Sequence, residues 1–246
     1  MEKFVKQYDV RSYECDKDSR LRLLTIFNLM QDMADTHADL MGVGYDACFQ
    51  KGIGWVGGNY HLRIHKLPKW REKIILKTWP TAKTFVTGIR DFEALNETGS
   101  ILFQASSQWV LIDLTKGRPV AVAKNLGNYE LLPERAIETQ FSTPPLPERT
   151  DFEKKFFVRY DDIDMNNHVN NAVYPVWAAE AVPPAFKACH DVAELEVSFK
   201  KPALSGDVVL IETQIDDKTT RHLIKSETNG TVFAQVAIQW TVHSED

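Results

Sequence analysis

Cysteine is scarce in this sequence and follows no spacing pattern. The 246 residues hold three cysteines, Cys15, Cys48 and Cys189, which lie far apart in the chain. Cysteine zinc sites need closely spaced pairs, and disulfide-bonded small domains need a denser and usually even set. The sequence therefore excludes a cysteine zinc site, makes a disulfide framework improbable, and favours the reducing environment of the cytoplasm.

Long apolar runs and excess positive charge are also missing. No run reaches the roughly 20 apolar residues that a membrane-spanning helix needs, and residues 1–8 lack the apolar stretch of a signal peptide. The formal net charge is −5, whereas nucleic-acid-binding domains usually carry a basic excess. We expect neither a membrane span nor nucleic-acid binding.

The apolar residues that are present suffice for a full core. They make up 43% of the chain, with 26% charged residues, which is ordinary for one large globular domain or two small ones. In residues 23–41 they recur every three or four positions, which predicts a long buried helix that ends near Gly42 and Gly44. His37 falls on its apolar face, and we interpret it as a core histidine. The helical positions are Leu23, Phe27, Met30, Ala34, Ala38 and Met41.

The remaining pattern is mostly that of strands, in two similar halves. One helix followed by antiparallel strands predicts an α+β fold in which a sheet wraps the helix. The motif Gln-x-x-x-Gln-Trp occurs at 104–109 and again at 235–240, and the turn at 66–69 resembles the turn at 200–203. These matches indicate an internal duplication. The predicted strands are 4–15, 59–66, 73–79, 84–95 and 101–113 in the first half, and 156–160, 194–200, 208–216, 220–228 and 231–242 in the second.

A connector separates the halves, from Thr115 to Glu153. It contains a helix candidate at 130–138 and a proline-rich stretch that is typical of an extended linker. Before the predicted strand 59–66, the glycines between residues 52 and 58 lack the lysine and the following helix of a phosphate-binding loop. We interpret them as loop and bend positions.

The densest group of polar side chains lies at residues 160–180. Asp164, Asn166 and His168 are spaced by two, which would place them on one side of an extended segment. A helix is expected to begin near Asn170, capped by Asn170 or Asn171. Asx-rich clusters before helices are more often caps and turns than active sites, and Asp162 fits that alternative best.

The same stretch carries a family resemblance. Asp164-x-Asn166-x-His168-Val-Asn-Asn-x-x-Tyr174, followed by Trp177 and Glu180, closely resembles the acyl-ACP thioesterases of fatty acid synthesis and, more distantly, other hotdog thioesterases. The resemblance implies a tandem hotdog fold. Residues 1–140 would form an N-terminal hotdog domain with the acyl pocket and connector, and residues 150–246 a C-terminal catalytic one. It also implies hydrolysis of acyl-ACP in the cytoplasm without cofactor or metal, with acyl carrier protein (ACP) as the partner and a homodimer possible.

The resemblance also implies roles for the three side chains as catalytic residues. Asp164 would be the base or nucleophile, Asn166 would orient water or polarise the carbonyl, and His168 would move a proton. Backbone N–H groups at 169–171 are the expected oxyanion donors. Plant members have been given a cysteine nucleophile and a neighbouring glutamate, but this chain has Lys200 and Lys201 there. This departure favours activated water, with Glu194 or Glu196 as possible additional groups.

The carrier and the activity leave alternatives open. ACP is acidic, so the resemblance points to basic turns as docking sites, although these charges could equally be ordinary solvated ones. An acyl-CoA thioesterase, a non-catalytic acyl-thioester-binding protein and a dehydratase on the same scaffold are the rival hypotheses. The basic turns consist of Arg63, Lys66, Lys69, Arg71 and Lys73 in the first half, and Lys200 and Lys201 in the second.

Overall fold

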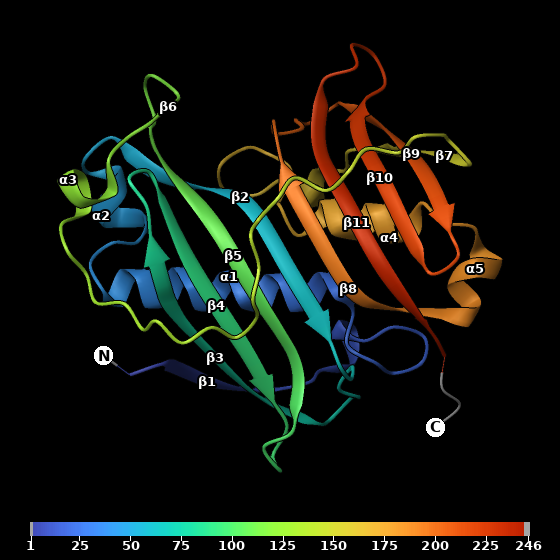
Figure 1. Cartoon of the computed structure of the whole chain (residues 1–246), viewed down its shortest axis with the longest axis horizontal. Coiled ribbons are helices and arrows are strands. Elements are labelled where there is room, and N and C mark those ends of the chain that lie inside the picture. The colour runs from blue at the N-terminus through green and yellow to red at the C-terminus, as the bar shows by residue number, and fades with distance from the viewer. Residues whose placement is uncertain (1, 244–246) are drawn as a thin grey trace. The chain divides into compact units, whose positions relative to one another are not determined.

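The computed structural model describes residues 2–243. The chain divides into two compact units, Met1–Gln140 and Phe141–Asp246. Each has an antiparallel sheet with a helix packed across one face (Figure 1). No helix within residues 2–243 has both the length and the apolar character needed to cross a membrane.

Unit 1 contains a five-stranded antiparallel sheet in the order β1-β3-β4-β5-β2, with a short sixth strand paired to β5. Helix α1 (Leu23–Leu40) lies across it because its apolar residues share one face. His37 is on this buried face, as predicted. The other elements are β1 (Phe4–Asp9), η1 (Ser12–Glu14), α2 (Tyr45–Phe49), β2 (Ile53–Ile64), β3 (Lys73–Lys83), β4 (Thr87–Leu95), β5 (Ile101–Asp113), β6 (Arg118–Pro119) and α3 (Val122–Leu126).

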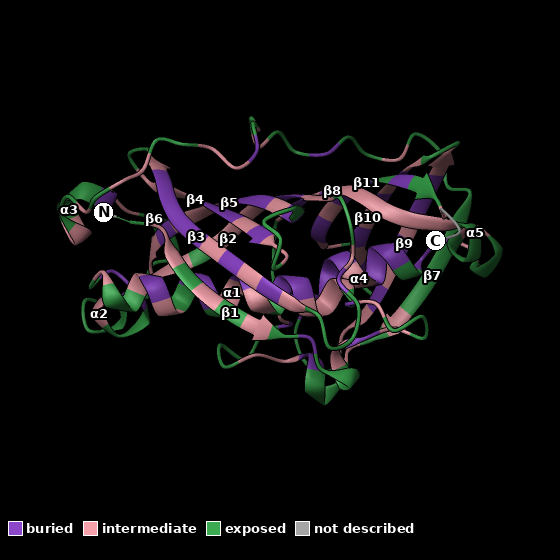
Figure 2. Ribbon diagram, turned by 90° about the horizontal axis from the view of Figure 1, so that it is seen from below, coloured by how far each residue is buried: buried purple, intermediate pink, exposed green. Residues whose placement is uncertain are grey.

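Unit 2 repeats the arrangement with the strand order β8-β11-β10-β9-β7. Its packed helix, α4 (Val173–Glu180), is less than half as long as α1 and is buried on most sides (Figure 2). It begins at Val173 rather than near Asn170, because the Asn170 side chain accepts the Ala172 N–H in a turn before the helix. The other elements are β7 (Phe152–Phe157), η2 (Tyr160–Asp162), α5 (Pro184–Cys189), β8 (His190–Phe199), β9 (Val208–Asp216), β10 (Thr219–Ser226) and β11 (Val232–Val242).

The strand registers show the duplication in detail. Trp109 on β5 lies opposite Gly57 at an irregular point of the pairing, and Trp240 on β11 lies opposite Val192 at a similar point. The two Gln-x-x-x-Gln-Trp segments thus occupy equivalent places. The turns also correspond, but Pro68 matches Ala203, one residue later in the second turn than the sequence indicated. The Leu21 N–H donates to the Pro68 carbonyl at 2.9 Å, and the Val169 N–H donates to the Ala203 carbonyl at 2.9 Å.

Two sequence predictions were wrong: one placed glycines of residues 52–58 in a loop, and the other placed a helix at 130–138. Gly54, Gly57 and Gly58 lie within β2, and an irregularity in its pairing with β5 falls between Gly57 and Asn59. Residues 130–138 are not helical, because their backbone groups bond to the sheet of unit 1 instead: Leu132 N–H donates to the Pro80 carbonyl, and the Glu134 carbonyl accepts the Trp79 indole N–H.

Candidate active site

The predicted site residues lie on a closed turn, residues 163–170, which we name the motif loop. An isolated bridge pairs Ile163 with Val169, and Asp164 N–H donates to the His168 carbonyl at 2.8 Å. Asn167 has a φ of 60° and reverses the chain. The prediction of an extended segment was therefore wrong. Asx side chains readily bond the backbone two residues ahead, and this local bonding outweighs the alternation of the sequence.

Asp164 shapes the motif loop with one carboxylate oxygen. Its Oδ1 accepts the backbone N–H of Asn166 at 2.8 Å and that of His168 at 3.5 Å. Among residues 2–243 no hydrogen bond engages Oδ2, so this oxygen is available to a ligand. The half-buried Asp164 thus has a structural role that leaves one oxygen for chemistry.

Asn166 and His168 present their side chains to the surface of unit 2. Both are exposed, and neither side chain forms a hydrogen bond with another residue of the described chain. The loop therefore brings a carboxylate, an amide and an imidazole onto one short turn, but it does not bond these three side chains to one another. A hydrogen-bonded turn that presents unengaged donors and acceptors suits a ligand site.

Asp162 has the capping role that its sequence context favoured. It is 1% exposed, and its carboxylate accepts the backbone N–H and the guanidinium of Arg159. These bonds form a capping box around η2 and hold the approach to the motif loop. Asp162 therefore supports the site from beneath it.

The expected oxyanion donors are largely committed elsewhere. Val169 N–H donates to the Ala203 carbonyl at 2.9 Å, and Asn170 N–H donates to the Asp162 carbonyl at 2.8 Å. Using either for an oxyanion would break a bond that closes the loop. The expectation was wrong for these two groups, while the exposed Asn166 side-chain amide forms no hydrogen bond within the described chain.

Unit 1 contains a second copy of this turn, residues 15–22, which we name the paired loop. Oδ1 of Asp16 accepts the N–H groups of Asp18 and Arg20, each at 2.9 Å, and Asp16 N–H donates to the Arg20 carbonyl at 2.8 Å. Ser19 has a φ of 59°, matching Asn167. The two loops share a backbone design, but Asp18 and Arg20 replace the amide and imidazole of the motif loop.

Arg20 in the paired loop is already engaged by acids. Its guanidinium lies 3.3 Å from an Asp16 carboxylate oxygen and 3.5 Å from one of Asp18. These ion pairs engage Arg20 within its own loop, whereas the Asn166 and His168 side chains form no hydrogen bond within the described chain. The sequence showed Asp16 and Asp18, but only the hydrogen bonds reveal that Arg20 stands where His168 does.

Tyr174 stands in the motif that carries the family resemblance, but sequence reasoning assigned it no role in the site. It is 1% exposed in α4, and its hydroxyl oxygen accepts the Ala203 N–H at 2.8 Å. Burial, with the charges of Asp164 and Asp207, raises the pKa of Tyr174 to about 12. Its signal in the sequence was a hydroxyl within the otherwise apolar run that predicted a buried helix.

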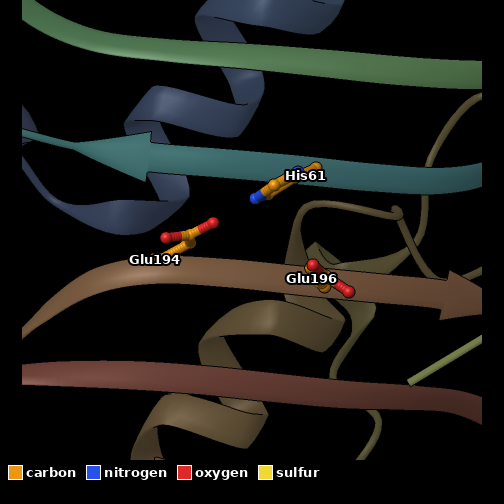
Figure 3. Close-up of side chains that lie close together, drawn as sticks. All are labelled: His61, Glu194 and Glu196. Atoms are coloured by element: carbon orange, nitrogen blue, oxygen red, sulfur yellow. The ribbon is translucent and has the colours of Figure 1, made fainter. Parts of the chain in front are cut away.

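The alternative catalytic groups are three cysteines and two glutamates. Cys15 and Cys48 are buried and Cys189 is exposed at the end of α5. Glu194 and Glu196 project from the same side of β8 (Figure 3). In the pairing of β8 with β11, Glu196 lies opposite Ala237. The equivalent position of unit 1, opposite Ser106 in the pairing of β2 with β5, holds the buried His61.

The basic turns of the two units differ in how far their side chains are engaged. Lys200 Nζ donates to Ser198 at 2.9 Å and to Thr143 at 3.0 Å, while Lys201 is exposed. In unit 1 the guanidinium of Arg71 lies 4.1 Å from the Trp70 ring centre, and Lys73 pairs with Glu97. Lys201 is therefore the more accessible lysine of its pair.

Comparison with known proteins gives the family. Residues 1–129 match the acyl-ACP thioesterase N-terminal domain, and residues 147–242 match the C-terminal domain. A palmitoyl-acyl carrier protein thioesterase of Cuphea hookeriana is 24% identical over 93% of this chain, and oleoyl-acyl carrier protein thioesterase 1 of Arabidopsis thaliana is 27% identical over 93%. The chain spans 60% and 66% of these relatives' lengths, and both are described as chloroplastic.

A solved structure supports the fold independently. The 12:0-ACP thioesterase from Umbellularia californica superposes with a TM-score of 0.87 at 21% identity, covering 98% of each chain. The prediction of a tandem hotdog of the α+β class is confirmed. With both domain matches in chain order, this protein belongs to the acyl-ACP thioesterase family.

Proposed function

We propose that this protein hydrolyses the thioester of acyl-ACP and releases a free fatty acid in fatty acid biosynthesis. Membership in the family and the names of its relatives support the reaction and the carrier. The observation that carries the proposal is the motif loop: one Asp164 oxygen fixes the backbone while the other oxygen, Asn166 and His168 remain open to a ligand.

The proposed roles follow from the free groups of the loop. Asp164 Oδ2 takes a proton from a water molecule, whose oxygen attacks the thioester carbonyl carbon. The Asn166 amide donates a hydrogen bond to the carbonyl oxygen as negative charge develops there. As the carbon–sulfur bond breaks, His168 passes the proton that Asp164 took from the water on to the departing thiolate, which restores both side chains. The products are the fatty acid and the carrier thiol.

The domain roles and the partner are part of the same proposal. Unit 2 carries the reacting groups, and unit 1 contributes the acyl pocket. ACP, an acidic protein, docks on basic side chains such as Lys201. A cytoplasmic location, a homodimer, and a reaction without metal or cofactor stay predictions.

Hydrolysis of matched acyl-ACP and acyl-CoA substrates tests the activity and the carrier together. We expect a higher kcat/KM for acyl-ACP. His168→Gln should lower kcat by roughly 100-fold, since a positioned proton donor contributes about that much. Arg20→Gln, the matched change in the paired loop, should leave kcat unchanged. A preference for acyl-CoA would favour the rival carrier, and binding of acyl-ACP without hydrolysis would favour the non-catalytic alternative.

A further inference from the structure

Ala203 is held on both sides of its backbone. Its N–H donates to the Tyr174 hydroxyl at 2.8 Å, and its carbonyl accepts the Val169 N–H at 2.9 Å. The residue is 0% exposed, so neither backbone group can exchange its partner for bulk water. Ala203 therefore connects α4 to the end of the motif loop.

The turn around Ala203 is also bonded to Val158, whose N–H donates to the Asp207 carbonyl at 3.2 Å, and to itself. Leu204 N–H donates to the Asp207 carboxylate at 2.8 Å, and Asp207 N–H donates to the Leu204 carbonyl at 3.1 Å. These local bonds close the turn, residues 201–207, without linking it to α4. The Tyr174 hydroxyl adds a tie to the helix that follows the motif loop.

In unit 1 the equivalent loop, turn and helix meet without a tyrosine hydroxyl. Pro68 takes the place of Ala203, because its carbonyl accepts the Leu21 N–H as Ala203 accepts that of Val169. Ile26 stands ten residues after Asp16, as Tyr174 stands ten residues after Asp164. Proline has no N–H to satisfy, and isoleucine offers no acceptor. The pairs Ile26–Pro68 and Tyr174–Ala203 are thus alternative ways of leaving no buried donor unbonded.

The Tyr174–Ala203 hydrogen bond occurs in unit 2, whose motif loop presents polar side chains without hydrogen-bond partners in the described chain. The paired loop is further held by the ion pairs of Arg20, which the motif loop lacks because His168 stands there. A loop with fewer hydrogen bonds and ion pairs of its own depends more on bonds to neighbouring segments to keep its conformation.

We propose that Tyr174 is a positioning residue: its hydroxyl fixes Ala203, and through the Ala203 carbonyl it holds the motif loop so that Asn166 and His168 keep one arrangement. The effect on rate rests on the proposed hydrolysis, and the effect on the loop does not. Catalysis is sensitive to the placement of reacting groups, so a looser loop lowers kcat more than it weakens substrate binding.

The test compares Tyr174→Phe with wild type in two measurements. Amide hydrogen exchange of peptides covering 163–170 and 201–207 should become about 10-fold faster, because the buried N–H of Ala203 has lost its acceptor. With acyl-ACP, kcat should fall about 10-fold while KM stays within twofold. His222→Phe, which likewise replaces a buried polar side chain by phenylalanine but lies on β10, is the control for the type of substitution and should change neither value.

A double-mutant cycle assigns the effect to the Ala203 N–H. Ala203→Pro removes that donor as Pro68 does in unit 1, and Tyr174→Phe should then cause no further change in exchange. Unchanged exchange in the single Tyr174→Phe variant, or equal effects in both backgrounds, would overturn the proposal. If wild type fails to hydrolyse acyl-ACP, the proposed function fails, and the exchange measurements alone still decide the role of Tyr174.

Discussion

Oδ1 of Asp164 accepts the backbone N–H of Asn166 at 2.8 Å, and Oδ1 of Asp16 accepts that of Asp18 at 2.9 Å. The same carboxylate bond thus builds a turn in each unit, and only one of the two turns displays an open amide and imidazole. Shape and chemistry can be tested separately, because asparagine keeps the acceptor oxygen that aspartate uses and loses the basic one.

Asp164→Asn should therefore abolish most activity while preserving the loop. We expect kcat for acyl-ACP to fall by about 100- to 1,000-fold, the range for loss of a general base, with Tm close to wild type. Asp164→Ala should lose the same activity and also lower the free energy of unfolding by about 1 kcal/mol. Asp16→Ala is the matched control: it should lower stability similarly without reducing kcat. Full activity in Asp164→Asn would show that the carboxylate is only structural.

Buried His222 should make the protein sensitive to acid. Its ring nitrogens lie 3.0 Å from Thr213 Oγ1 and 2.7 Å from Thr220 Oγ1, and burial lowers its pKa to about 3. As the pH falls below about 6.5, His222 takes up a proton in the unfolded chain but stays neutral in the folded chain. The free energy of unfolding therefore falls as the pH falls. By pH 4 the loss should be on the order of 3 kcal/mol.

His222→Phe should remove this part of the acid dependence. Phe92 already stands opposite Thr78 in unit 1 as His222 stands opposite Thr213 in unit 2, so the ring should fit. Urea unfolding of both proteins between pH 7 and pH 4 measures the effect. Parallel loss of stability in the two proteins would mean that another group, such as His37, governs the acid response; its pKa is lowered to about 4 by burial and by the nearby Arg90.

Arg135 should stabilise unit 1 by compensating a buried carboxylate. Asp91 is 0% exposed and accepts the Arg135 guanidinium at 2.9 Å and the Ala136 N–H at 2.8 Å. Arg135→Met should lower the free energy of unfolding by about 3 kcal/mol, because it leaves the Asp91 charge without its cation. Adding Asp91→Asn should recover part of this loss. If the double variant is as unstable as the sum of the single changes, the two side chains are not coupled.

Lys201 should contribute to the binding of ACP. Lys201→Glu is expected to raise KM for acyl-ACP several-fold at low salt, with kcat unchanged and the difference reduced at high salt, since exposed charges are screened. Lys218→Glu, at the turn between β9 and β10, makes the same charge change at another turn of unit 2 and should leave KM unaltered. An equal rise in both variants would indicate a general effect of net charge.

The sequence by itself determined the element types and the location of the polar cluster. Leu23–Leu40 was recognisable as a helix because its apolar residues repeat at the period of an α-helix, and β5 and β9 were bounded correctly by alternation and flanking turns. The repeated glutamine–tryptophan motif showed the duplication, because equivalent strand positions demand similar side chains. Local patterns of this kind carry their information within a few neighbouring residues.

Only the tertiary structure decided how the polar groups are used. The spacing of Asp164, Asn166 and His168 predicted an extended segment, yet hydrogen bonds to backbone N–H groups made a closed turn. The bonds of Val169 and Asn170 engage two expected oxyanion donors. The pairing of Tyr174 with Ala203 joins residues 29 positions apart. Such partners are chosen by the requirement that buried donors be satisfied, which depends on chain segments that meet only after folding.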